Sequence, residues 1–364
     1  MTMTPPFTID AHLDLAINAV EWNRDLTRPI AEIRARETDL SDKPGRGRNT
    51  VCLPELRRGN IGLVVATQLA RVKQGDAYSP VFGWQSQAQG WAMTQAQLSW
   101  YRAMEEAGEM KSIRSRADLE TQVALWQNAK SDATAKLPIG YLLSLEGADS
   151  LLTPAHLERA YAQGLRAIGP AHYGPGVYAM GTDATGGFPP RGRELLAEIE
   201  RLGLILDVTH LSDDCFWEAL KLFSGPLWAS HHNCRALVPH QRQLSDEQIR
   251  ALIERDAVIG AALDAWMIVP GWVRGETTPE ARDLRLEKLV EHIDHICQIA
   301  GNARHVGLGS DLDGAFGREQ TPLDVNTIAD VQRLPELLRA RGYTEEDAVK
   351  FAHENFLRFL RRVL

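Results

Sequence analysis

The chain has 364 residues and a net charge of −8, with 44% hydrophobic and 24% charged residues. This composition is typical of a folded globular protein with a sizeable core, and it excludes an intrinsically disordered chain. Lysine and arginine form no block along the sequence, which argues against nucleic acid or an anionic membrane as the main partner.

Short apolar segments that end in polar residues recur along the chain. Their continuous apolar character is typical of parallel strands that helices cover, because both faces of such a strand are buried. In chain order, the expected strands are residues 7–15, 61–70, 137–147, 164–172, 203–212, 226–232, 256–264 and 305–314.

Segments with helical periodicity lie between these strands. Thr153 followed by Pro154 predicts an N-cap and a first helical residue, and Ser245 to Gln248 form a capping box. Glycines are common at helix C-termini. The expected helices cover residues 84–108, 153–164, 191–203 and 212–225, and the expected terminating glycines are Gly164, Gly203 and Gly225.

Eight strands that alternate with helices predict an α/β fold, a closed (β/α)8 TIM-type barrel. The alternative is an open doubly wound sheet, but no Gly-x-Gly-x-x-Gly follows the first strand. The length would permit two domains. Because no linker divides the chain, we predict one catalytic barrel domain over residues 1–364.

The stretch IDAHLDLAIN places His12 and Asp14 two residues apart on the first expected strand. Alternate residues of a strand point to the same face, so both side chains would approach one point. This geometry suits a metal ion. The alternative is a polar loop or a hydrogen-bonded strand end, and the motif by itself does not decide between them.

Histidines or carboxylates end six of the eight expected strands. Each one could by itself be a buried polar residue that hydrogen bonds satisfy, but the carboxyl ends of barrel strands meet around one axis. Imidazoles and carboxylates without cysteine suit zinc or a similar divalent ion. These residues are His12, Asp14, Glu146, His172, His210, His231 and Asp311.

The ligand count favours two metal ions over one. His12 and Asp14 form one cluster and His210 and His231 another, while Glu146 has two oxygens with which to bridge them. Two ions roughly 3.5–4 Å apart can hold a bridging hydroxide and polarise a carbonyl. The pattern therefore predicts a hydrolase.

The motifs SLEG, DVTHLS, SHHNCR and HVGLGSDLDG, after the His-x-Asp of the first strand, resemble the membrane dipeptidase (renal dipeptidase) family of zinc peptidases. Their order matches from residue 9 to about residue 314, and HENFLRFL at 353–360 resembles the C-terminal helix of that family. The resemblance implies a soluble, bacterial-type member with two zinc ions per chain that cleaves L,L and L,D dipeptides.

The resemblance also implies roles for individual residues. His12 and Asp14 would hold one zinc, His210 and His231 the other, and Glu146 would bridge the two ions.

In the family, a histidine at the fourth strand end contacts the substrate carbonyl, and GPAHYG places His172 there. An arginine after the sixth strand binds the substrate carboxylate, and VPHQRQLSD places Arg242 there. As a hypothesis, Asp311 carries the proton from the attacking hydroxide to the leaving amine. Asp313 is expected to belong to a structural turn, and without the resemblance Arg242 would be interpreted as part of a surface salt bridge.

The chain departs from the family pattern at Ala11, Leu13, His232 and Gln243. Leu13 is expected to point away from the metals and to leave coordination intact. His232 and Gln243 are expected closer to the substrate, where they would change which dipeptide is preferred.

The sequence leaves two alternatives to dipeptide hydrolysis open. One is another amidohydrolase activity at the same binuclear centre, such as N-acyl amino acid deacylation; the other is a catalytically inactive peptide-binding relative. The presence of all five ligands and of Asp311 argues against the second.

The remaining expectations concern location, cysteines and assembly. MTMTPPFTID has no signal peptide character and FLRFLRRVL cannot span a membrane, so we expect a cytoplasmic protein. The four cysteines lack Cys-x-x-Cys pairing and are expected to be free thiols. The Trp-rich segment 84–101 suggests a homodimer contact, although Trp84, Trp91 and Trp100 also suit a core.

Overall fold

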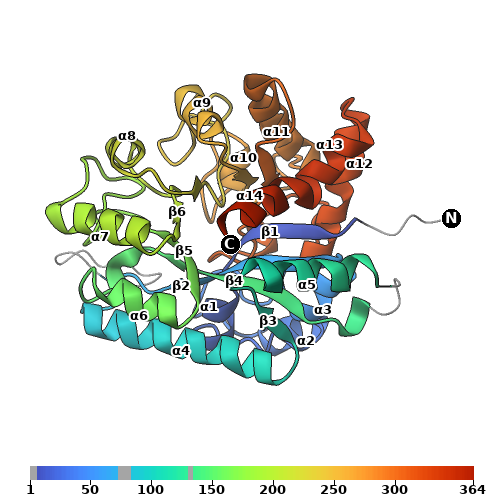
Figure 1. Ribbon diagram of the computed structural model, residues 1–364. Helices are drawn as coiled ribbons and strands as arrows, with labels where there is room; N and C mark the ends of the chain where they lie inside the picture. The colour runs from blue at the N-terminus through green and yellow to red at the C-terminus, as the bar shows by residue number, and fades with distance from the viewer. Residues whose placement is uncertain (1–5, 73–82, 130–133) are drawn as a thin grey trace.

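A computed structural model describes residues 6–72, 83–129 and 134–364 of the chain (Figure 1). The domain expected over residues 1–364 therefore includes residues 1–5, 73–82 and 130–133, which lie outside the described residues, as does the first half of MTMTPPFTID.

A parallel sheet forms the centre of the molecule, and helices surround it (Figure 1). Eight of its strands follow one another in the order β7-β6-β5-β4-β2-β1-β9-β8, and β3 pairs with the beginning of β4. The strands are β1 (Thr8–Leu13), β2 (Ile61–Leu69), β3 (Met110–Ser112), β4 (Ile139–Glu146), β5 (Leu165–Gly169), β6 (Ile205–Asp207), β7 (Leu227–Trp228), β8 (Ile259–Ala261) and β9 (Val306–Leu308).

Backbone contacts between β7 and β8 close the sheet into a barrel. Ala229 pairs with Ile259, and the His232 N–H donates to the Gly260 carbonyl at 2.7 Å. A Cβ atom at Gly260 would lie 1.9 Å from the Ser230 oxygen, so only glycine permits this close approach. The closure confirms the predicted barrel and excludes the open doubly wound sheet.

The helices lie outside the barrel and cover the apolar strands, several of which are buried along their whole length. They are α1 (Leu15–Val20), α2 (Ile30–Arg36), α3 (Leu53–Arg58), α4 (Gln87–Glu106), α5 (Arg116–Gln127), α6 (His156–Ala162), α7 (Pro190–Arg201), α8 (Asp213–Leu222), α9 (Asp246–Glu254), α10 (Ala265–Ile268), α11 (Leu286–Ala300), α12 (Leu334–Ala340), α13 (Glu345–Val349) and α14 (Asn355–Val363), with a π-helical turn at Lys350–Glu354. Short 3-10 turns occur at Thr134–Lys136, Ala148–Ser150, Arg318–Gln320 and Ile328–Arg333.

Several helix boundaries differ from those that the sequence predicts. The Thr153–Pro154 start is wrong, because these residues form a preceding turn and α6 begins at His156. Gly225 does not close a helix, since α8 ends at Leu222. The capping box at Ser245 and Gln248 is confirmed at the start of α9.

The segment around the expected homodimer contact packs within the chain. Trp91 and Trp100 are partly buried and contact the core, and Trp84 pairs with Val72. The four cysteines are free and buried. Within the described ranges, no helix combines the length and apolar character that crossing a membrane requires.

Candidate functional site

A regular spacing places the predicted site residues at the mouth of the barrel. His12 lies within β1, Asp14 directly follows it, and Glu146 is the last residue of β4. The other four lie three residues beyond the ends of β5, β6, β7 and β9, as the strand bounds show: His172, His210, His231 and Asp311.

Backbone bends help to position two of these side chains. His210 has φ 67° and Asp311 has φ 57°, a left-handed conformation that residues other than glycine rarely adopt. A buried carboxylate fixes one of the bends, because Asp207 accepts hydrogen bonds from the backbone N–H groups of Thr209 and Ser230, both at 3.1 Å. Such strained positions are concentrated at functional sites.

Glu146 lies between two groups of metal-donor atoms. Its Oε2 is 3.6 Å from the Nε2 of His12, and Asp14 joins that group. Its Oε1 is 3.3 Å from the Nε2 of His210 and 3.5 Å from the Nε2 of His231. Each group brings its donor atoms within 4.8 Å of one another, so the two oxygens of one carboxylate face two candidate metal positions.

Hydroxyl groups orient the imidazole rings. The Nδ1 of His210 is 2.8 Å from the Thr182 Oγ1, and the Nδ1 of His231 is 3.0 Å from the Ser230 Oγ. Contacts of this kind fix which ring nitrogen faces a metal. They leave the Nε2 atoms directed toward Glu146.

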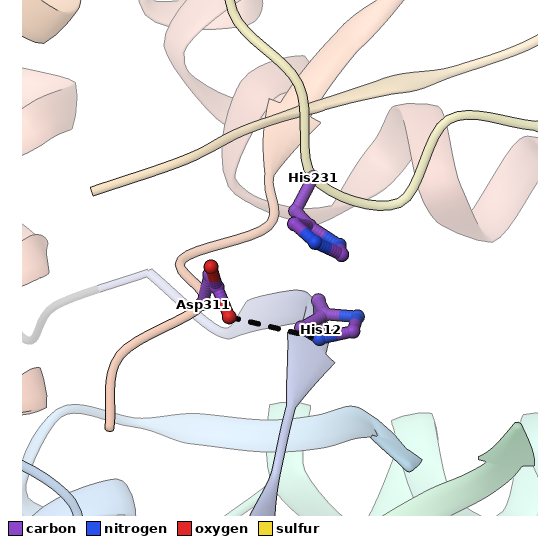
Figure 2. A group of neighbouring side chains, drawn as sticks. All are labelled: His12, His231 and Asp311. Carbon is purple, nitrogen blue, oxygen red and sulfur yellow. Dashed lines mark ion pairs between the residues drawn. The ribbon is translucent and has the colours of Figure 1, made fainter. Parts of the chain in front are cut away.

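Asp311 forms a third donor group with His12 and His231. Figure 2 shows the three side chains converging from the loop after β9, the end of β1 and the loop after β7. The Asp311 Oδ1 lies 3.7 Å from the His12 Nε2, and the His12 and His231 ring centroids are 3.7 Å apart. Asp311 therefore lies at the edge of the candidate metal positions.

Burial shifts the pKa of every ionisable group in this cluster. It lowers the pKa of His12 to about 3, so this ring is neutral and offers a lone pair. It raises the pKa of Asp14 to about 6. Burial, together with neighbouring carboxylates, raises the pKa of Glu146 and Asp311 well above the ordinary range. A bound cation would offset this repulsion.

A cavity of about 430 Å³ opens above the donor groups. This volume lies in the range of about 300–1,000 Å³ that small-molecule sites occupy. The predicted substrate residues His172 and Arg242 line the cavity, together with the donors Asp14, Glu146, His210, His231 and Asp311. The Nδ1 of His172 is buried without a hydrogen-bond partner among the described residues.

Arg242 is a buried side chain rather than part of a surface salt bridge. Its Nη2 donates to the His231 carbonyl at 3.1 Å, and its Nη1 lies 3.3 Å from the Nδ1 of His232. The Nε has no partner among the residues that the structure describes. The guanidinium therefore retains donor capacity at the cavity wall.

The departures from the family pattern lie away from the cavity surface. Ala11 and Leu13 are completely buried. His232 lies behind Arg242, and the Gln243 side chain binds the Asn233 N–H and the Met267 carbonyl. Neither residue lines the cavity itself, but each contacts a residue that does, Arg242 for His232 and Met267 for Gln243.

Sequence reasoning missed several residues that line the cavity. Asp264 lies three residues after β8, the same position that four predicted site residues occupy on other strands. The expected strand over residues 256–264 ends with this residue, so its position alone indicates a place at the mouth of the barrel. Arg71, Tyr173 and Arg274 also line the cavity, and they carry no such signal because they lie in loops.

Asp313 is not part of the donor groups. Its carboxylate accepts hydrogen bonds from the Thr50 N–H at 2.7 Å, the Thr50 hydroxyl at 2.8 Å and the Val51 N–H at 2.9 Å. It therefore connects the loop after β9 to the segment before α3, a structural contact as the sequence predicts.

A closed parallel barrel with buried histidines and carboxylates at its strand ends is an architecture typical of metal-dependent hydrolases. A profile of one family, described as membrane dipeptidase (peptidase family M19), matches residues 2–364. The chain belongs to this family of metallopeptidases.

Curated relatives include both uncharacterized proteins and dipeptidases. An uncharacterized Klebsiella pneumoniae protein is 34% identical over 215 residues, which cover 57% of this chain and 75% of that protein. An uncharacterized dipeptidase of Schizosaccharomyces pombe is 26% identical over 279 residues, 72% of this chain and 64% of the relative. A Claviceps purpurea dipeptidase is 28% identical over 230 residues, which cover 61% of this chain and 50% of that protein. The chain thus spans less than two thirds of either dipeptidase.

Two solved structures have the same fold along nearly the whole chain. One is a dipeptidase described as a metallopeptidase of family M19, with a TM-score of 0.76, 24% identity and 99% coverage of both chains. The other is a Rhodobacter sphaeroides metallopeptidase bound to a phosphinate mimic of the dipeptide L-Ala-D-Ala, with a TM-score of 0.75 and 24% identity, covering 99% of this chain and 100% of that one. At this identity the similarity establishes the barrel fold.

Proposed function

We propose that this protein hydrolyses dipeptides, both L,L and L,D, at a centre of two zinc ions. The observation that carries the proposal is the position of Glu146, whose two carboxylate oxygens face separate groups of imidazole and carboxylate donors. One anionic residue can thereby serve two metal positions. The membership in a metallopeptidase family and the dipeptidases among the relatives support the reaction class.

The donor set fits two divalent ions. The His12 Nε2 is buried without a hydrogen bond to any described residue, although three carboxylates lie within 3.9 Å of it. A neutral imidazole surrounded by carboxylates needs a cation, and nitrogen and oxygen donors without thiolates suit zinc. Bound there, zinc would supply hydroxide at neutral pH and polarise the scissile carbonyl.

The side chains around the donor groups supply binding and proton transfer. His172, a neutral ring in the cavity wall, would donate a hydrogen bond to the carbonyl oxygen as its charge develops. Asp311, with its raised pKa, can accept the proton of the nucleophile and deliver it to the leaving amine.

Arg242 would bind the free carboxylate at the C-terminus of the substrate. A guanidinium matches a carboxylate with two parallel hydrogen bonds, and its burial excludes competing water. Peptides that continue beyond this carboxylate would leave the buried arginine without its anion. The cavity and Arg242 together therefore favour dipeptides over longer chains.

Metal analysis with Glu146→Gln tests the binuclear centre. The unaltered protein should bind two zinc ions per chain, and the variant should lose affinity at both positions because an amide cannot bridge as an anion. Thr182→Val is a matched control that removes a contact of His210 alone. Loss of one ion with the other held at full affinity in Glu146→Gln would contradict the bridging role.

A substrate panel separates dipeptide hydrolysis from the other amidohydrolase activity. We expect L-Ala-L-Ala and L-Ala-D-Ala to be cleaved by the zinc-loaded protein, and N-acetyl-L-alanine to be cleaved much more slowly. The reverse preference would identify a deacylase. Zinc-loaded protein that binds dipeptides without cleaving them would identify an inactive relative.

A further inference from the structure

Three arginines line the cavity, and the contacts of two are accounted for. Arg242 is anchored to the His231 carbonyl and faces the proposed carboxylate position. Arg274 forms an ion pair with Asp264 at 2.9 Å, and its Nη2 lies 3.3 Å from the hydroxyl of Tyr173. Its charge is therefore balanced within the protein.

Arg71 differs from Arg274 because it forms no ion pair with a described residue, and it differs from Arg242 because the proposed reaction gives it no role. Its Nη2 donates to the Tyr173 carbonyl at 2.8 Å, and no described carboxylate lies within 4.0 Å of its guanidinium. Asp149 acts on the Arg71 charge from beyond ion-pair distance, and its carboxylate accepts a hydrogen bond from the Val177 N–H at 2.7 Å. A partly buried guanidinium with unused donors is costly unless an anion binds it.

The barrel places Arg71 across the cavity from Arg242. Arg71 follows β2, which ends at Leu69, whereas Arg242 is bound to the backbone that follows β7. In the order of the closed sheet, β2 and β7 lie four positions apart among eight strands, which is the opposite side of the barrel. The candidate metal positions lie between the two arginines.

We propose that Arg71 binds a carboxylate on the side chain of the N-terminal residue, so that the enzyme prefers dipeptides that begin with glutamate or aspartate. This inference rests on the proposed function. With the C-terminal carboxylate at Arg242 and the scissile carbonyl at the metal positions, the N-terminal residue extends toward β2 and Arg71. A carboxylate there would accept hydrogen bonds from the guanidinium N–H groups that the Tyr173 carbonyl does not use.

Charge elsewhere in the cavity agrees with this assignment. Asp264 is neutralised by Arg274, and Asp183 lies 3.4 Å from the Nε2 of His240. Asp14, Glu146 and Asp311 belong to the candidate metal groups. Arg71 is thus the lining cation that remains free, among the described residues, for a second anionic group of the substrate.

The test compares acidic substrates with their uncharged isosteres. The zinc-loaded enzyme is assayed with L-Glu-Ala against L-Gln-Ala and with L-Asp-Ala against L-Asn-Ala, where alanine has the configuration that the enzyme accepts. We expect kcat/KM to favour the acid of at least one pair by about tenfold to a hundredfold, the range that hydrogen bonds to charged groups supply.

Variants of Arg71 assign the preference to this residue. Arg71→Met should bring the acid-to-amide ratio close to one, and Arg71→Lys should retain part of it. Arg71→Glu should shift the preference toward L-Lys-Ala over L-Gln-Ala. A residue that only holds the Tyr173 loop would change both substrates of a pair alike and leave the ratio unchanged.

Arg274→Lys is the matched control, because Arg274 lines the same cavity, already has a carboxylate partner, and lysine keeps the charge that balances Asp264. It should keep the acid-to-amide ratio. Equal cleavage of acid and amide by the unaltered enzyme, or a ratio that survives in Arg71→Met, would overturn the role of Arg71 and leave dipeptide hydrolysis intact. Failure of zinc-loaded protein to cleave any dipeptide would overturn both proposals.

Discussion

Two sets of buried carboxylates lie near the mouth of the barrel, and they differ in their hydrogen-bond partners. Asp10 accepts hydrogen bonds from the His12 N–H at 3.1 Å and from the Ser310 N–H at 2.9 Å. By contrast, no hydrogen bond from a described residue reaches the side chains of Glu146 and Asp311, whose neighbours are imidazoles and other carboxylates.

Burial alone does not distinguish these two sets. It raises the pKa of Asp10 to about 6, and it is also the largest cause of the raised pKa of Glu146 and of Asp311. The partners distinguish them, because backbone and hydroxyl donors stabilise the carboxylate of Asp10 inside the protein. A carboxylate that faces other carboxylates needs a cation or a proton instead. The first set holds the strand ends in place, and the second supplies the chemistry.

The largest expected effect follows from removing the proton carrier of the second set. Asp311→Asn keeps the size of the side chain but cannot accept a proton at neutral pH. We expect kcat for L-Ala-L-Ala to fall about 10²- to 10⁴-fold, the usual contribution of a general acid or base. Steady-state kinetics with zinc analysis on the same sample measures it.

The reference for Asp311→Asn is the unaltered enzyme, assayed at the same zinc content per chain. If the variant retains its zinc and stays within a few-fold of normal activity, another group transfers the proton. If it loses zinc, the donor group with His12 and His231 includes Asp311 as a ligand.

The next largest effect is expected at Arg242, the buried arginine in the cavity wall beside the second set. Arg242→Met should reduce kcat/KM for dipeptides about a hundredfold more than for their C-terminal amides, because only the free acid loses a buried charge pair. Kinetics on paired acid and amide substrates gives the ratio directly. His232→Ala is the control, since His232 contacts Arg242 from behind; a larger acid-specific loss in that variant would contradict the assignment.

The residues at the strand ends could be predicted from the sequence. The seven strand-end residues share a pattern of position, and a closed barrel brings such positions together whatever the exact strand bounds are. The sequence carries a weaker signal for the residues of the cavity wall. Arg71 and Arg274 lie in loops, where no periodicity relates a residue to its neighbours in space.

Details that depend on backbone geometry could not be predicted. Thr153 and Pro154 are typical of a helix start, but the chain makes one more turn before α6 begins at His156. His232 was expected near the substrate because it follows a predicted ligand. Its N–H joins the β7 and β8 seam, and its ring lies behind Arg242.

A smaller effect is expected at Asp313, which belongs with the hydrogen-bonded set. Asp313→Asn places an amide N–H group against donors from Thr50 and Val51, so at least one of them loses its acceptor. We expect the free energy of unfolding to fall by about 2 kcal/mol, the cost of an unsatisfied buried polar group. Denaturant unfolding measures it, and kcat of the folded fraction should change little; a loss of activity with unchanged stability would place Asp313 in the catalytic set.

The smallest expected effect separates the two sets by the sign of a stability change. In the presence of a chelator, Glu146→Gln should raise the free energy of unfolding by roughly 1 kcal/mol, because it removes a carboxylate whose pKa burial and Asp14 raise. Asp10→Ala should lower it under the same conditions, because the N–H groups of Ser310 and His12 then lose their acceptor. Thermal unfolding of the metal-free proteins measures both changes. Destabilisation by Glu146→Gln in chelator would show that this carboxylate is held by the protein itself, as Asp10 is, and that the difference between the two sets does not depend on a metal.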